Sequence, residues 1–163
     1  MKRFSIVLIV AVAAFARADN KPSATNASDM KFVNAPALPT CFTMAVQMGD
    51  PMTTQFIAAT RVKAGCQIPW HWHSYSENLM VVSGSAHVGM RDEKGAIMAK
   101  SVTAGAFVSM PAKHVHELRC EKACEIYLYS DGKFDIHYVD PKGNELQPAE
   151  ALKGVKETAT AMK

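Results

Sequence analysis

The chain has little that would suit it to a membrane or to nucleic acid. After the first 18 of its 163 residues, no hydrophobic run reaches the roughly 20 residues that a membrane-spanning helix needs. Basic and acidic residues number 18 and 15, and no patch of the kind that binds nucleic acid stands out. Internal repeats and alternating strand–helix patterns are also missing. A single domain without nucleic-acid contacts is therefore the starting expectation.

The first residues resemble an export signal. Lys2 and Arg3 precede an apolar run over Phe4–Phe15, and Ala16-Arg17-Ala18 matches a cleavage site. We therefore expect residues 1–18 to be a signal peptide, with the protein exported to the periplasm or secreted after cleavage near Ala18. An uncleaved membrane anchor is the alternative. Cleavage would remove three basic residues and leave a nearly neutral chain without stable membrane insertion.

The rest of the chain predicts an all-β domain. Residues 19–31 are polar and read as a flexible lead-in, whereas short apolar runs separated by turn residues fill 32–147 and favour a sandwich or barrel. Residues 148–163 suit a short helix or a tail. The expected strands are Cys41–Val46, Gln55–Val62, Glu77–Val82, Ala86–Met90, Phe107–Met110, His114–Leu118, Glu125–Ser130 and Lys133–Val139.

The segment His71-Trp-His-Ser-Tyr-Ser-Glu77 is the most informative part of the sequence. Side chains alternate along a strand, so His71 and His73 point the same way. Glu77, just past a bend, can add a carboxylate. Histidine–carboxylate sets with open positions suit Fe, Mn, Ni, Cu or Zn as one divalent ion.

Two spaced motifs resemble those of the cupin family. Five residues separate Gly65 from His71, and six separate Glu77 from Gly84, as in the first cupin signature. Gly105, Pro111 and His116 fit the second signature. Lys113 departs from it, because the family has a glycine there and a non-glycine residue resists a positive φ. Cys120 stands where the family often has asparagine.

The resemblance implies a cupin-type jelly-roll β-barrel that forms homodimers. It also implies one divalent transition metal, held by His71, His73, Glu77 and His116 next to a pocket for a small-molecule substrate. Glu77 is then a candidate catalytic base. His114 and Tyr75 are candidate proton carriers, although a surface or packing role is the simpler interpretation of both.

The four cysteines are compatible with two disulfides in an exported chain. Cys120 and Cys124 flank Glu-Lys-Ala, which we interpret as a short hairpin loop, so the sequence favours a Cys120–Cys124 bridge. Cys41–Cys66 follows by elimination. As an alternative, Cys120 lies four residues after His116 on the same strand face, where a thiol could contact the metal.

Three functions stay open on the sequence. The first is a metal-dependent dioxygenase acting on a small enol or phenol. The second is a non-redox lyase, isomerase or decarboxylase in which the ion acts as a Lewis acid. The third is a module that binds a metal or a small molecule without catalysis.

Overall fold

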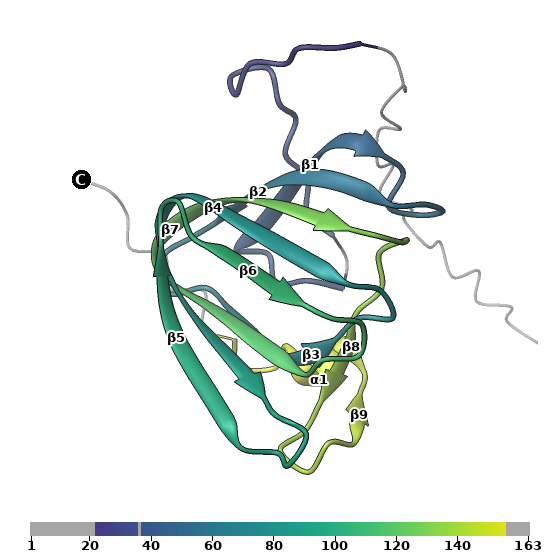
Figure 1. Ribbon diagram of the computed structural model, residues 1–163, viewed down its shortest axis with the longest axis vertical. Helices are drawn as coiled ribbons and strands as arrows, with labels where there is room; N and C mark the ends of the chain where they lie inside the picture. Colours follow the sequence, from purple (N-terminus) through teal and green to yellow (C-terminus); the bar gives the residue numbers. More distant parts are fainter. Residues whose placement is uncertain (1–21, 36, 156–163) are drawn as a thin grey trace, which may run out of the picture.

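The computed structural model describes residues 22–35 and 37–155, so the predicted signal peptide lies outside the described residues. These residues form nine strands and one short helix, which confirms the all-β prediction (Figure 1). The elements are β1 (Phe42–Gly49), β2 (Phe56–Val62), β3 (Gln67–Trp72), β4 (Glu77–Arg91), β5 (Ile97–Thr103), β6 (Phe107–Met110), β7 (His116–Ser130), β8 (His137–Val139), β9 (Glu145–Leu146) and α1 (Pro148–Ala151).

The strands form a jelly roll in which β4 and β7 each contribute to both layers. The first half of β4 pairs with β6 and with the second half of β7, which continues to β2 and β1. The second half of β4 pairs with β5 and with the first half of β7, which continues to β3, β8 and β9. The sheet does not close, because strands such as β5 and β6 each pair with β4 alone. Apolar side chains from both layers fill the space between them.

A bulge at Gly84 lets β4 run through the point where a turn was expected. Glu77, Leu79 and Val81 face the interior before Gly84, whereas Ala86 and Val88 do so after it. Odd positions therefore give way to even ones, as an inserted bulge residue requires. Gly84 has φ +85, and a Cβ there would lie 2.0 Å from the Ala123 carbonyl oxygen. Only glycine fits this close backbone approach.

The cysteine prediction is half wrong. The structure contains the Cys41–Cys66 disulfide, but Cys120 and Cys124 are free thiols. No hairpin loop separates them, because both lie within the continuous strand β7, near the point where it leaves β3 and joins β2. Their thiols are in hydrogen-bond contact, which together with burial raises the pKa of Cys120. Cys120 is also absent from the histidine cluster described below.

Other strand boundaries also differ from the predicted ones. β6 is confirmed as predicted, whereas β4 and β7 each merge two expected strands. β3 was expected only as the extended segment that carries His71 and His73, and it ends at Trp72; β5 and β9 were not among the predicted strands. The expected strand 133–139 is paired only over His137–Val139.

The chain ends outside the strands are only partly described. Residues 22–31 form no strand or helix, and α1 ends at Ala151. The remainder of the expected C-terminal helix or tail beyond residue 155 lies outside the described residues. Within the described part of the chain, no helix is long and apolar enough to cross a membrane.

Candidate metal centre

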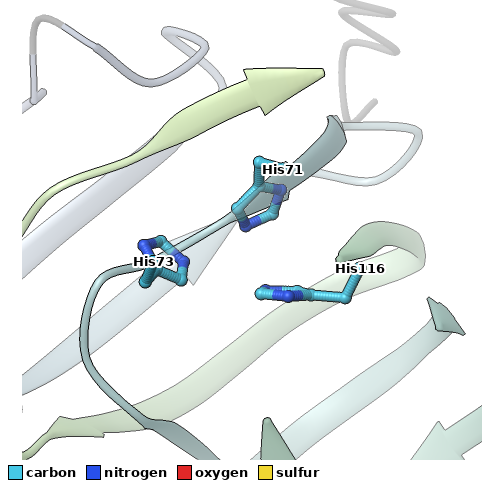
Figure 2. Close-up of side chains that lie close together, drawn as sticks. All are labelled: His71, His73 and His116. Carbon is cyan, nitrogen blue, oxygen red and sulfur yellow. The ribbon is translucent and has the colours of Figure 1, made fainter. Parts of the chain in front are cut away.

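Strand pairing brings the predicted ligands together from three strands. His71 near the end of β3 faces His116 at the start of β7 in the sheet register. His73 follows β3 directly, and Glu77 begins β4 after the short connection between the two strands. One ring nitrogen from each histidine lies within 4.8 Å of the other two (Figure 2). His71, Glu77 and His116 are buried, and His73 is nearly so.

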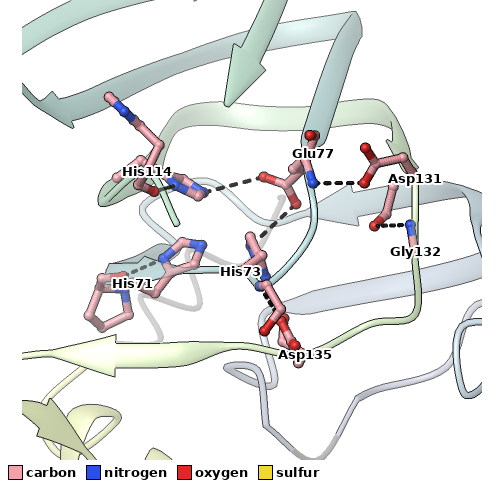
Figure 3. Close-up of polar contacts among 12 residues, drawn as sticks. His71, His73, Glu77, His114, Asp131, Gly132 and Asp135 are labelled. Atoms are coloured by element: carbon pink, nitrogen blue, oxygen red, sulfur yellow. Dashed lines mark hydrogen bonds and ion pairs between the residues drawn. The ribbon is translucent and has the colours of Figure 1, made fainter. Parts of the chain in front are cut away.

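All three rings are oriented by backbone carbonyl groups. His71 Nδ1 lies 2.7 Å from the Pro69 oxygen, and His116 Nδ1 lies 2.9 Å from the His114 oxygen. His73 Nδ1 bonds the carbonyl oxygen of Asp135 (Figure 3). A carbonyl can only accept, so each Nδ1 must carry a proton, and in the neutral ring the lone pair is then on Nε2. This is the tautomer in which Nε2 can bind a metal.

The Glu77 carboxylate lies against two of these rings. Its Oε1 is 3.6 Å from His73 Nε2, and its Oε2 is 3.3 Å from His116 Nε2. Burial opposes ionisation of Glu77, but the His73 and His116 rings outweigh it and hold the pKa of the carboxyl below its usual range. Burial first, and then the electrostatic effect of the neighbouring His116 and His73 rings, lower the pKa of His71 well below its usual value. The cluster therefore combines a neutral imidazole with an ionised carboxylate.

The donor atoms fit a divalent cation. Among the described residues, Nε2 of His73 and Nε2 of His116 are buried and have no hydrogen-bond partner. An unsatisfied buried polar atom costs about 1–3 kcal/mol, so such atoms call for an explanation. A metal ion bound between these nitrogens and the carboxylate would satisfy all of them.

The cluster opens on a small apolar cavity between the layers. The volume of this cavity is about 30 Å³. The walls are mostly aliphatic and aromatic, and include Leu79, Phe134 and Ile136. Among the described residues, no lysine or arginine lines it.

The predicted proton carriers lie at other places. Neither His114 nor Tyr75 is among the residues that line the cavity. His114 supplies its backbone oxygen to His116. The Tyr75 ring packs on Gly132, where an added Cβ would come within 2.1 Å of it. Their catalytic roles stay predictions.

Two aspartates near the site were missed by the sequence analysis. Asp131 Oδ1 accepts a hydrogen bond from Ser76 N–H at 2.8 Å, and Asp135 Oδ1 accepts one from Ser74 N–H at 2.8 Å (Figure 3). Both fix the connection that carries His73 to Glu77. The sequence offered only the pair Asp131-Gly132, which indicates a turn. It gives no sign that these aspartates contact residues about 60 positions earlier in the chain.

The Lys113 departure from the second motif has a visible structural cost. Lys113 has φ 64 and is the one non-glycine residue with positive φ in the described part of the chain. Its N–H donates to the His73 carbonyl oxygen at 2.8 Å. The turn therefore keeps the conformation expected of glycine and contacts a predicted ligand residue.

Comparisons with known proteins agree with this geometry. A family model described as "Cupin domain" matches residues 59–130. A search of curated proteins found no match to the chain.

The fold of the chain is similar to those of several solved structures. An RmlC-like cupin protein from Ralstonia eutropha JMP134 is 18% identical, with a TM-score of 0.58 and 77% of each chain covered. A variant of Bacillus subtilis oxalate decarboxylase is 25% identical, with a TM-score of 0.54, and the match covers 66% of this chain but only 29% of the decarboxylase. The Staphylococcus aureus capsular polysaccharide assembling protein CapF is 16% identical with a TM-score of 0.55, covering 68% and 32%. The chain thus spans about a third of the length of the last two.

Proposed function

Because the chain belongs to the cupin superfamily, we propose that it binds one divalent transition metal at the three-histidine, one-glutamate cluster and acts as an oxygenase on a small enol or phenol. The observation that carries this proposal is a pair of buried nitrogens, His73 Nε2 and His116 Nε2, that have no hydrogen-bond partner and lie 3.6 and 3.3 Å from the ionised Glu77 carboxylate. A redox-active ion bound there would supply electron transfer to the substrate or to dioxygen.

The cavity favours a neutral substrate. Without a lysine or arginine among its described lining residues, a dicarboxylate would enter with no cationic side chain to pair its second charge. An enol or phenol carries a hydroxyl proton and an apolar body that suits the Leu79, Phe134 and Ile136 walls. The Glu77 carboxylate, kept ionised by its neighbours, can accept that proton at Oε1 or Oε2. The cavity as it stands is smaller than a phenol, so the proposal requires the wall side chains to move when the substrate enters.

Oxygen consumption tests this proposal. Wild-type protein loaded with Fe²⁺, Cu²⁺ or Ni²⁺ should consume dioxygen in step with loss of a small enediol or catechol. Glu77→Gln should lower the rate by about 100-fold or more, the scale of a lost general base. His87→Ala is the matched control, because His87 contacts Ser101 on another part of the sheet. No uptake with any loaded metal would overturn the oxygenase proposal.

A non-redox decarboxylase or lyase is the second candidate, favoured by the 25% identity with oxalate decarboxylase. Here the ion would act as a Lewis acid, and His114 or Tyr75 would move the proton after a change in the cavity wall. Turnover of a small carboxylic acid at equal rates with and without dioxygen would identify this reaction. Saturable metal binding with no turnover of either kind would instead leave a binding module.

The proposal includes export and pairing with a second copy. N-terminal sequencing of protein from the exported fraction should begin after Ala18, and a start at Met1 would exclude cleavage. Light scattering should give the mass of two chains, and a one-chain mass would exclude the homodimer.

A further inference from the structure

Of the three histidines in the cluster, His73 is the one whose backbone lies outside the strands. His71 and His116 both lie within paired strands and face each other in register. His73 follows the last residue of β3 and belongs to the connection that leads to β4. Its backbone oxygen accepts from Lys113 N–H, but this bond leaves the ring free to rotate about χ1 and χ2. The direction of its Nε2 therefore depends on what the ring itself contacts.

Asp135 contacts this connection at two successive residues. Its backbone oxygen bonds His73 Nδ1, and its carboxylate Oδ1 accepts from Ser74 N–H at 2.8 Å (Figure 3). One residue thus fixes the ligand ring and the backbone next to it. The two bonds also span a sequence distance of about 60 residues, so they join the two segments that form this side of the site.

Residues 131–136 form no strand. The Phe134 N–H donates to the Pro51 oxygen at 2.7 Å, and the Asp135 carboxylate adds further contacts that fix its own residue. Asp135 Oδ2 lies 3.8 Å from His137 Nε2, and the other nitrogen of that ring lies 3.6 Å from Glu145 Oε2. The His137 ring stacks on Trp72 with centroids 3.8 Å apart and planes 4° apart. Trp72 directly precedes His73. The His137 ring therefore links Asp135 and Glu145 to the residue next to the proposed ligand.

We propose that Asp135 is a positioning residue for the metal centre, whose carboxylate fixes its backbone oxygen so that His73 keeps a protonated Nδ1 and directs Nε2 at the ion. The proposal rests on the proposed metal site. Partners of this kind orient metal-binding histidines, and their loss usually weakens metal affinity by about 10- to 100-fold. Asp135 itself touches neither ion nor substrate.

The tautomer of His73 in metal-free protein tests the positioning directly. We expect ¹⁵N NMR of the wild type to show His73 with its proton on Nδ1. Asp135→Ala should shift a large fraction to the other tautomer while His71 and His116 stay unchanged. Asp135→Asn keeps an oxygen acceptor for Ser74 N–H and should keep the wild-type tautomer. An unchanged tautomer in folded Asp135→Ala would overturn the proposal.

Co²⁺ affinity, measured by absorption titration, gives the second test. Asp135→Ala should raise the Kd about 10- to 100-fold, and Asp135→Asn by less than about threefold. The control is Asp92→Asn, because Asp92 Oδ1 likewise accepts backbone N–H groups, but in the β4–β5 turn. If Asp135→Ala does not fold, His137→Phe replaces it, since a phenyl ring can still stack on Trp72 but gives Oδ2 no partner. That variant should raise the Kd by at least about threefold.

The outcomes separate this proposal from the proposed function. Wild-type protein that binds no Co²⁺, with His73 still on the expected tautomer, would overturn the metal site alone. Wild-type binding that is lost in His73→Ala but unchanged in Asp135→Ala and His137→Phe would overturn the positioning role alone.

Discussion

Replacing Lys113 by glycine should stabilise the protein, although it removes a side chain from the turn next to His73. Lys113 has φ 64, a left-handed conformation that costs a non-glycine residue about 1–2 kcal/mol. Glycine removes that cost but adds about 0.4–1 kcal/mol of conformational entropy to the unfolded chain. The difference leaves a net gain of about 1 kcal/mol, which raises Tm by roughly 2–5 °C in a domain of this size.

Urea unfolding of the metal-free mature protein measures this gain. Two controls separate backbone strain from loss of the lysine. Lys113→Ala removes the side chain but keeps a Cβ at positive φ, so its stability should stay near that of the wild type. Lys100→Gly makes the same exchange in the exposed strand β5, and should lose about 0.5–1 kcal/mol. A Lys113→Gly variant no more stable than Lys113→Ala would refute the strain argument.

Three further predictions concern stability. Gly84→Ala should lower the free energy of unfolding by about 3 kcal/mol or more, measured in urea, because the added Cβ meets the Ala123 oxygen at 2.0 Å and φ is +85. A loss of under about 1 kcal/mol would contradict the bulge geometry. A double serine substitution that removes the Cys41–Cys66 bridge opens a loop with a separation of 25 residues. The denatured chain then gains entropy, so we expect the free energy of unfolding to fall by about 3.5 kcal/mol. An unchanged urea midpoint would contradict this expectation. Burial, followed by the electrostatic effect of the His116 and His73 rings, lowers the pKa of His71 in the folded protein. In the unfolded chain this residue has its ordinary pKa, so below about pH 6.5 the unfolded chain binds a proton that the folded chain does not. Metal-free stability should therefore fall between about pH 7 and 5, and His71→Asn should flatten that slope; equal slopes in both proteins would exclude this role.

The sequence could predict which residues form the cluster because most of them are set by short-range spacing. His71, His73 and Glu77 lie within seven residues, and the glycine spacing around them indicated which strand and turn carry them. His116 came from the second motif, and the structure places its ring against the other two. Lys113 was expected to disturb the turn, because a non-glycine residue resists a positive φ, but its φ of 64 keeps the conformation expected of glycine.

Long-range pairing could not be predicted in the same way. Gly84 has the local signature of a turn, but the partner strand β7 accommodates it as a bulge, and β4 continues. Cys120 and Cys124 appeared to flank a hairpin because nothing local shows that β7 changes its partner there from β3 to β2. Asp135 lies 62 residues from the ring it orients, so its role depends on tertiary contacts alone.

Metal content is the most direct measurement on the central claim. Untagged mature protein from the exported fraction, with His73→Ala and His87→Ala beside it, would be analysed by mass spectrometry after dialysis against metal-free buffer. We predict about one transition-metal ion per chain in the wild type and in His87→Ala, and a loss of most of it in folded His73→Ala. Equal metal content in His73→Ala, or no metal in any of the three folded proteins after incubation with each divalent ion, would contradict the assignment of this cluster as a metal centre.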